Sequence, residues 1–184
     1  MLNRKTFFQL YRDRLDKNKK ISQQEVDALD LFLDMFESEK DYFTIPQWAY
    51  VFATVFHETA FTFEPVREAF HLSEAWRKNN LRYYPWYGRG YVQTTWEENY
   101  RKDEERTGIP FTKNPDLALV PRNAFCTMLY NMKHGVYTGK RLDYYINNDR
   151  KSYLYARYVI NGKDKRFTIA SYAETFEFIL TKSM

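Results

Sequence analysis

Apolar residues recur mostly at helical spacing in this chain. Near the N-terminus, Phe7, Tyr11 and Leu15 fall on one face of a predicted first helix. That helix leads into a charged run at residues 16–20, which we interpret as a solvated turn; a nucleic-acid-binding patch is the alternative. The chain is therefore expected to begin with an amphipathic helix and an exposed turn.

Two helix starts carry sequence signatures. Ser22 and Glu25 match a capping box, in which the serine accepts a backbone N–H and the glutamate reaches back to the cap. Thr44 repeats the signature, with Pro46 in the first turn, where its missing N–H costs little. Pro65 must end or interrupt this third helix. The apolar positions of the two helices are Val26, Leu29, Leu33 and Phe36, then Trp48, Val51, Phe52 and Val55.

The second half of the chain alternates loops with helices. Residues 79–100 are aromatic and contain glycine, so we expect a loop or a short hairpin that leads into a helix, and residues 114–116 predict a turn. Pro121 begins another helix, which Gly135 is expected to cap. Further helices are expected over 154–160 and from about residue 168. The pattern predicts a mainly α fold with at most a small β element. We expect a single domain over residues 1–184, in which residues 1–45 form N-terminal helices packed on the core.

Composition narrows the environment of the protein. Aromatic residues make up 19% of the chain, which suits a sugar-binding cleft, although ordinary core and surface positions account for most of them. Cys126 is the single cysteine, so no intramolecular disulfide can form, as expected for a reducing cytoplasm. Residues 1–15 lack the apolar region of a signal peptide, and no segment approaches a membrane span of roughly 20 apolar residues. The net charge of +4 favours an anionic partner, namely nucleic acid, anionic lipid or cell wall.

Glu58 is the first candidate for chemistry. It lies three residues after Val55 and seven after Val51, so at about 100° per residue it shares their face of the third helix. Partial burial and the negative end of the helix dipole both favour the protonated form of such a carboxyl group. A protonated carboxyl is what a glycosidic leaving group needs as general acid. The alternative is that the helix frays and the side chain points to water.

Other residues complete a candidate hydrolytic site. Glycoside hydrolysis usually needs a second carboxylate. Three glutamates follow within 16 residues, and their spacing does not choose between them: Glu64, Glu68 and Glu74. The Gly-Arg-Gly segment at 88–90 permits close backbone approach. Gln93, Thr94 and Thr95 follow it and offer neutral groups that can bind sugar hydroxyls or a water.

Three ordered segments resemble family 19 glycoside hydrolases, which comprise the class I chitinases and related phage and prophage endolysins. They are HET at 57–59, GRG at 88–90 continuing to Asn99 and Tyr100, and ING at 160–162. The phage branch is the closer match by its recurring segments, and the absence of the disulfides typical of plant chitinases again favours it. The segments similar to that branch are ISQQEVDAL, FATVFHETAFTFEPVREAF, YGRGYVQTTWEENY, NPDLAL, GVYTGKRL and INGKDK. The resemblance runs from about residue 20 to the C-terminus.

The resemblance implies a lysozyme-like helical domain and assigns roles. Glu58 matches the general acid, Glu68 is taken as the general base of an inverting mechanism, and Thr95 falls where the family holds the attacking water. Inversion places the two carboxyl groups about 6.5–9.5 Å apart. The matching cleft-lining groups are Gln93, Asn99 and Asn161, with Tyr87, Arg89 and Tyr91 as further candidates for the same wall.

Other chemistries are disfavoured. The chain has three histidines but no HExxH pattern and no cysteine pair, so no metal site is expected, and His57 is interpreted as a helix-end residue. Cys126 is expected in the core and not as a nucleophile. An amidase that cuts the peptide stems usually needs a zinc ion or a Cys-His pair, so this activity is disfavoured. A nucleic-acid-binding module would need a clustered basic face or a known motif.

The sequence therefore predicts an endolysin with N-acetylmuramidase activity on peptidoglycan glycan strands. The alternatives are a lytic transglycosylase that uses Glu58 alone, a chitinase, and a non-catalytic wall-binding or virion protein. We expect a monomer without cofactor, nucleic acid or stable membrane insertion. With no signal peptide, it is expected to stay in the host cytoplasm until it is released to the cell wall.

Overall fold

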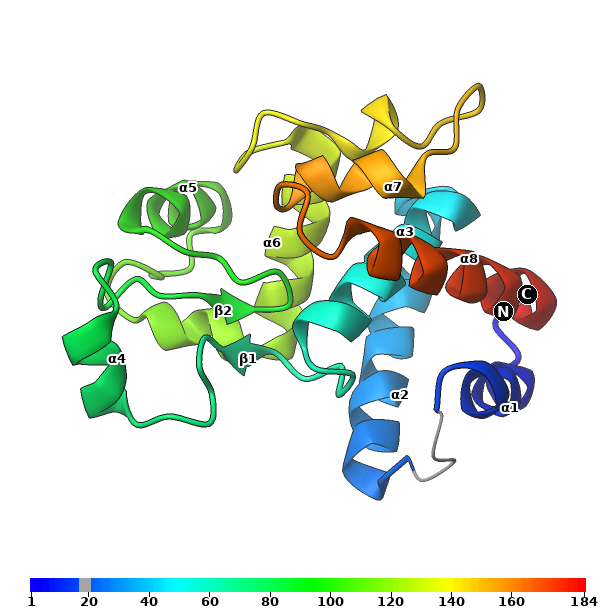
Figure 1. Ribbon diagram of the computed structural model, residues 1–184, viewed down its shortest axis with the longest axis horizontal. Helices are drawn as coiled ribbons and strands as arrows, with labels where there is room; N and C mark the ends of the chain where they lie inside the picture. Colours follow the sequence, from blue (N-terminus) through cyan, green and yellow to red (C-terminus); the bar gives the residue numbers. More distant parts are fainter. Residues whose placement is uncertain (17–20) are drawn as a thin grey trace.

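Helices dominate the computed structural model, which describes residues 1–16 and 21–184 (Figure 1). This described part contains eight α-helices and one antiparallel pair of two-residue strands, so the predicted mainly α fold with a small β element is confirmed. The helices are α1 (Arg4–Arg14), α2 (Gln23–Ser38), α3 (Ile45–Glu58), α4 (Glu74–Asn80), α5 (Glu97–Thr107), α6 (Pro121–His134), α7 (Tyr153–Ala156) and α8 (Arg166–Ser183). The strands are β1 (Val66–Arg67) and β2 (Arg89–Gly90).

Helix α3 forms the centre of the main core. Every residue from Gln47 to Phe56 is buried, as in a helix surrounded by protein on all sides. The last helix, α8, lies along α3 and contributes Ile169, Phe176 and Ile179 to the same cluster. Aromatic side chains fill much of this core, which suits the high aromatic content of the sequence.

The N-terminal helices pack onto this core. Arg4 of α1 forms ion pairs with three acids of α2, and its neighbour Asn3 caps α1 through the backbone N–H of Thr6. The two ends of the chain meet, because the Asn3 N–H donates to the carbonyl oxygen of Ser183 at 2.7 Å. Figure 1 shows both termini on the right-hand side, close to α1 and α8.

A smaller group of elements lies on the other side of α6. In Figure 1, α4, α5 and the two strands lie to the left of α6, and α1, α2, α3 and α8 lie to its right. The left-hand group has its own small apolar cluster of Tyr100, Phe111 and Ala118. The strands pair Val66 with Gly90 and Arg67 with Arg89, which brings residues 60–70 beside the Gly-Arg-Gly segment.

Most helix starts agree with the sequence, and one helix end does not. Both predicted capping boxes, at Ser22 and Thr44, are formed, and Gly135 ends α6 in the left-handed conformation with φ +68°. The prediction that Pro65 ends or interrupts the third helix was wrong, but the placement of Glu58 at the C-terminal end of that helix is confirmed. Helix α3 stops at Glu58 because the following turn takes positive φ at Ala60 and Phe61, so the helix has already ended before the proline.

The segment 79–100 was only partly predicted. It contains β2 and leads into α5, as expected, but it begins inside α4, which the apolar pattern did not indicate. Ser73 caps α4, and only Arg77 of that helix is buried. The predicted solvated turn at 16–20 lies mostly outside the described residues, since 17–20 are not described.

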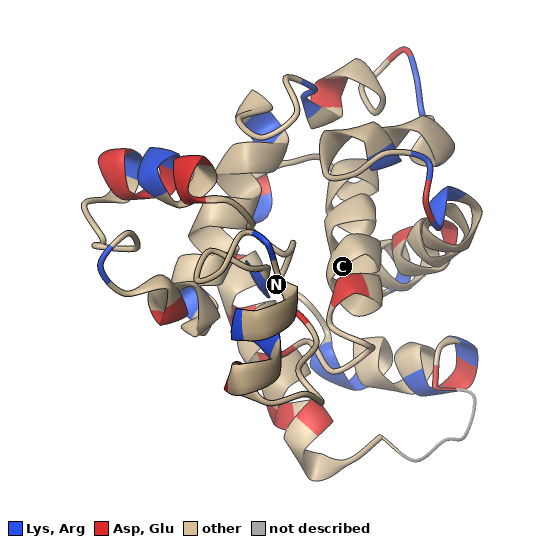
Figure 2. Ribbon diagram, turned by 60° about the vertical axis from the view of Figure 1, so that its left-hand side comes forward, with Lys and Arg blue, Asp and Glu red and all other residues tan. Residues whose placement is uncertain are grey.

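Charges of both signs share the surface helices (Figure 2). Helix α5 alternates acids and bases and forms the i,i+4 pairs Glu98–Lys102 and Arg101–Glu105. Among residues 1–16 and 21–184, no helix combines the length and hydropathy that a membrane crossing requires.

Candidate active site

Six of the nine residues predicted for the site line one cleft of about 570 Å³. It lies where the C-terminal end of α3 faces the segment that follows β1 and the turn between β2 and α5. The predicted residues in its wall are Glu58, Glu68, Gln93, Thr95, Asn99 and Asn161. These residues come from four separate stretches of the chain, so only the tertiary fold brings them together.

Glu58 enters the cleft from the last residue of α3. The side chain is 17% exposed, and its Oε1 accepts a 2.6 Å hydrogen bond from Nη1 of Arg157. The Arg157 guanidinium is itself buried, and its Nε donates to the carbonyl oxygen of Asp164. The contact fixes one carboxylate oxygen and leaves Oε2 without a hydrogen bond to any described residue. That oxygen is the one available to a ligand in the cleft.

The reason for the partial burial of Glu58 differs from the one predicted. The helix is buried on every side from Gln47 to Phe56, so sharing a face with Val51 and Val55 does not by itself place the carboxylate. Glu58 is half-buried because α3 ends there and opens into the cleft. The ion pair between Glu58 and Arg157 was not predicted from the sequence.

Glu68 is held by four hydrogen bonds just after β1. Its Oε1 accepts from the hydroxyl of Tyr83 at 2.6 Å, and its Oε2 accepts from the backbone N–H of Gly88 at 2.9 Å. Its own N–H donates to the Gly88 carbonyl, and its carbonyl accepts from Nε of the buried Arg77. A carboxylate that accepts one hydrogen bond at each oxygen keeps further lone pairs free for a water.

Two neighbours explain why Glu68 is held this way. Burial, and then the hydrogen bond to Glu68, raise the pKa of Tyr83 to about 12, so its hydroxyl remains a donor at neutral pH. Gly88 allows the backbone to approach closely. A Cβ at this position would lie 2.8 Å from Oε1 of Gln93 and 3.3 Å from Oε2 of Glu68. The close approach predicted for the Gly-Arg-Gly segment is therefore confirmed at its first glycine.

The turn from Gln93 to Trp96 forms the wall beside Glu68. Gln93 and Trp96 both have positive φ, at +56° and +74°, a costly conformation for residues other than glycine. The Gln93 amide donates to the carbonyls of Val66 and Gly90, and the Thr95 hydroxyl donates to the Gln93 carbonyl. Because the Thr95 hydroxyl already donates its proton to that carbonyl, the lone pairs of its Oγ1 can accept a hydrogen bond from a water.

The amide side chains of the cleft are anchored through the backbone. Asn99 Nδ2 donates to the Thr95 carbonyl at 2.8 Å, which ties the start of α5 to the turn. Asn161 is exposed, and its Oδ1 accepts the Gly162 N–H at 2.7 Å. The remaining polar atoms, Oδ1 of Asn99 and Nδ2 of Asn161, offer one acceptor and one donor to a ligand in the cleft.

A buried polar network supports the same wall from behind. Tyr137, which lines the cleft, donates to Oδ2 of Asp103 and forms a 2.8 Å hydrogen bond with the Thr94 hydroxyl. Asn131 Nδ2 donates to the other oxygen of Asp103 at 3.2 Å. Burial raises the pKa of Asp103, and hydrogen bonds from Tyr137 and Asn131 oppose that rise. The network joins α5, α6 and the turn that carries Thr95.

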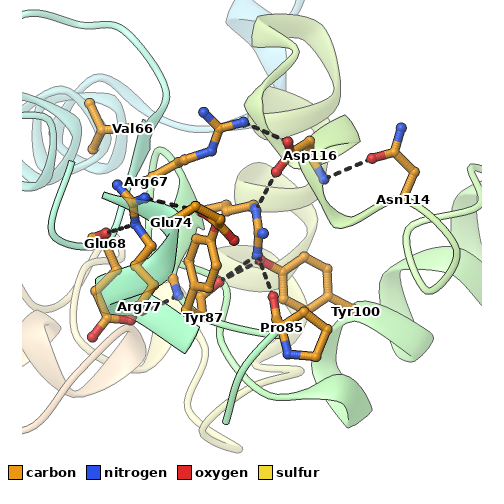
Figure 3. Close-up of polar contacts among 12 residues, drawn as sticks. Val66, Arg67, Glu68, Glu74, Arg77, Pro85, Tyr87, Tyr100, Asn114 and Asp116 are labelled. Carbon is orange, nitrogen blue, oxygen red and sulfur yellow. Dashed lines mark hydrogen bonds and ion pairs between the residues drawn. The ribbon is translucent and has the colours of Figure 1, made fainter. Parts of the chain in front are cut away.

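Tyr87, Arg89 and Tyr91 do not line the cleft. The Arg89 side chain of β2 is buried, and its guanidinium lies 3.6 Å from the centre of the Tyr87 ring and pairs with Asp116. Its Nη1 donates to the carbonyls of Pro85 and Tyr87. Tyr91 packs in the main core against Phe32. Figure 3 shows Tyr87, Tyr100 and Asp116 among the polar contacts of this region.

The alternative second acids also lie elsewhere. Glu64 lines a separate pocket of about 400 Å³ beside α2 and accepts a hydrogen bond from Gln24. Glu74 is exposed on α4, where it pairs with Arg77 and accepts from the Tyr87 hydroxyl. Glu68 is the candidate that shares a cleft with Glu58.

Sequence reasoning missed several residues of the cleft. The missed groups in its lining include Arg82, Tyr83, Trp96, Tyr137 and Thr138, and Arg157 lies behind Glu58. Tyr83 and Trp96 fall in the aromatic stretch that the sequence marked only as loop or hairpin. Arg157 carried no local signal, because its partner lies 99 positions earlier in the chain.

Comparisons with known proteins add no family assignment: no protein-family model, curated protein or solved structure matches the chain. Within the described residues, no three His, Cys, Asp or Glu side chains gather as a metal ion would require.

Proposed function

We propose that this protein is a glycoside hydrolase of the family 19 type, from the phage and prophage endolysin branch. Its substrate is the β-1,4 bond between N-acetylmuramic acid and N-acetylglucosamine in bacterial peptidoglycan. The observation that carries the proposal is the shared cleft of Glu58, Glu68 and Thr95. Glu58 lies at a helix end with one carboxylate oxygen free, Glu68 is held by hydrogen bonds to both of its carboxylate oxygens, and the Thr95 hydroxyl lines the same cleft.

The proposed reaction divides the work between the two carboxyl groups. Glu58, protonated at Oε2, gives its proton to the glycosidic oxygen while the bond from that oxygen to the anomeric carbon breaks. A water donates one hydrogen bond to Thr95 and one to Glu68, so its lone pair faces the opposite side of the sugar. Its oxygen bonds to the anomeric carbon and its proton passes to Glu68, which gives inversion. Glu68 then releases its proton to solvent, and Glu58 takes one up from solvent, so both groups return to their starting states.

The setting follows from the same proposal. The working partner is the glycan strand, the reaction needs no cofactor, and a monomer suffices because the cleft is built within one chain. Before lysis the protein would be held in the host cytoplasm and would reach the wall through a membrane lesion.

Digestion of purified peptidoglycan tests the proposal, with mass spectrometry of the glycan ends. Wild-type protein is expected to create new reducing N-acetylmuramic acid ends, and the Glu58→Gln and Glu68→Gln variants are expected to lose at least about 100-fold in rate. Glu64→Gln is the matched control, because this glutamate lies in a separate pocket, and it should keep wild-type activity.

Other products would point to other functions. Anhydro-muramic ends would identify a lytic transglycosylase, and reducing N-acetylglucosamine ends would move the cut to the other glycosidic bond. Chitin oligosaccharides tested alongside would identify a chitinase if they alone were cut. Cleavage of neither polymer would leave a non-catalytic wall protein.

A further inference from the structure

Arg82 is a cation in the cleft with no carboxylate partner among the described residues. Three acidic or basic side chains line the cleft, namely Glu58, Glu68 and Arg82. Glu58 is paired with Arg157, and Glu68 is satisfied by a hydroxyl and a backbone N–H. The Arg82 guanidinium instead lies 5.1 Å from the centre of the Trp96 ring, and the side chain is exposed. Its charge is therefore available to a ligand.

Arg82 belongs to a continuous wall that ends at Glu68. Trp96 contacts Tyr83 edge to face, with ring centres 4.9 Å apart, and the Tyr83 hydroxyl donates to Glu68. Trp96 is 45% exposed, so part of its ring surface remains open to a sugar. The order along the wall is a cation, an aromatic surface and then the second carboxylate. A sugar next to the scissile bond would lie against this wall.

Chitin and peptidoglycan differ in the charged groups that they could present to Arg82. Chitin is an uncharged polymer of N-acetylglucosamine. In peptidoglycan, every second sugar carries a lactyl group on O3, which ends in a free carboxylate or continues into a stem peptide with carboxylates of its own. A guanidinium beside a sugar platform recognises a carboxylate at such a position and nothing equivalent in chitin.

We propose that Arg82 binds the acidic substituent of N-acetylmuramic acid and makes the cleft selective for peptidoglycan over chitin. This inference rests on the proposed function and names its specificity determinant. Arg82 contributes to binding of the ground state and of the transition state alike, so its removal should raise KM and leave kcat nearly unchanged.

The experiment compares three soluble glycans of equal length with four proteins. The glycans are a peptidoglycan oligosaccharide with stem peptides, the same oligosaccharide after enzymatic removal of the peptides, and a chitin oligosaccharide. The proteins are wild type, Arg82→Gln, Arg82→Lys and Arg122→Gln. Arg122 is an exposed arginine on α6 outside the cleft, so its variant carries the same loss of charge.

Arg82→Gln is expected to lower kcat/KM about tenfold on a glycan that bears carboxylates and to leave chitin cleavage unchanged. Arg82→Lys should recover part of the loss, and Arg122→Gln should show none. A loss on the stripped glycan assigns the lactyl carboxylate, and a loss confined to the peptide-bearing glycan assigns the stem peptide. An equal loss on chitin, or no loss on either peptidoglycan glycan, would overturn the inference.

Binding of the same glycans to Glu58→Gln, with and without Arg82→Gln, separates this inference from the proposed function. If the wild-type protein cuts no glycan but Arg82→Gln still weakens the binding of the peptidoglycan glycans, the proposed hydrolysis is contradicted. The role of Arg82 in recognising the acidic substituent is then still supported. If Arg82→Gln leaves their affinity unchanged, the specificity determinant fails whatever the enzyme cuts.

Discussion

The Glu58 carboxylate depends on a guanidinium that lies 99 residues later in the chain. Arg157 is 2% exposed at its side chain and makes one bond to Glu58 and one to the Asp164 carbonyl. Arg157 is buried and Glu58 is partly buried, so removing either partner leaves the other charge poorly compensated. The position of the proposed acid is therefore a property of the pair.

Replacing Arg157 with methionine is expected to destabilise the protein by about 3–5 kcal/mol, because it leaves a carboxylate uncompensated in a partly buried place. Arg157→Lys should lose less, since a charge remains. Urea unfolding of both variants measures the difference. Adding Glu58→Gln to Arg157→Met should restore part of the stability, and a double variant as unstable as the sum of the singles would exclude the pairing.

His57, next to Glu58, makes stability depend on pH. Burial lowers the pKa of His57 below its usual value, although the neighbouring Glu58 opposes this. The unfolded chain therefore takes up the proton first, so the contribution is complete above pH about 6.5 and is lost as the pH falls through the folded pKa. Melting temperatures between pH 5 and 8 should show a fall on the acid side that is smaller in His57→Gln. Parallel curves for the two proteins would contradict this.

Among the elements, the antiparallel pair of β1 and β2 and the residues that flank it set the geometry of the second carboxylate. Strand pairing places Val66 opposite Gly90, and Gly88 then supplies the N–H that holds Glu68. The buried Arg77 fixes the backbone of Glu68 from the other side. The strand pair and these two contacts fix the position of Glu68, which lies in the loop directly after β1.

Gly88→Ala is expected to lower activity on peptidoglycan by at least about tenfold, because the new methyl group meets Gln93 and Glu68 and displaces the carboxylate. The loss of stability should stay within about 1–3 kcal/mol. Gly162→Ala is the control, because a Cβ there meets no atom within 4 Å. Turnover and urea unfolding of both variants decide the matter, and wild-type turnover in Gly88→Ala would argue against this role.

The elements also show how far sequence alone could go. Helix starts were predictable, because capping at Ser22 and Thr44 is local chemistry between residues three apart. The end of α3 was not, because Ala60 and Phe61 adopt positive φ without the glycine that normally marks it. Helix α4 lacks an apolar stripe and holds to the fold mainly through Arg77, so periodicity did not indicate it.

Some residues of the candidate site were placed in the cleft correctly from the sequence, and others were placed there wrongly. Glu58, Glu68, Thr95 and the three amide residues were named from the sequence by motif and resemblance, and the fold gathers them in one cleft. Arg89, Tyr87 and Tyr91 lie in the same motif, yet their side chains point into the protein and are buried. A motif identifies a segment, but the alternation of inward and outward side chains within it is settled by tertiary packing.

Over the whole molecule, the buried Asp103 network ties the α5 side of the cleft to α6. Tyr137 lies between Asp103 and Thr94, and burial raises its pKa well above the usual value, so it stays a donor. Tyr137→Phe would leave a buried carboxylate oxygen and a hydroxyl without this partner. We expect a loss of about 1–3 kcal/mol in the free energy of unfolding, measured in urea. A variant as stable as wild type would show that water replaces the hydroxyl.

The burial of α3 beneath α8 has a consequence for synthesis on the ribosome. Helix α3 emerges early, yet the surface that covers it and the arginine that pairs with Glu58 both come from the last part of the chain. Until α8 docks, a nascent chain exposes its most apolar helix and lacks an assembled acid. The proposed active site would therefore assemble only after Arg157 and α8 have been synthesised and packed, and an interrupted translation product would be a substrate for chaperones and proteases.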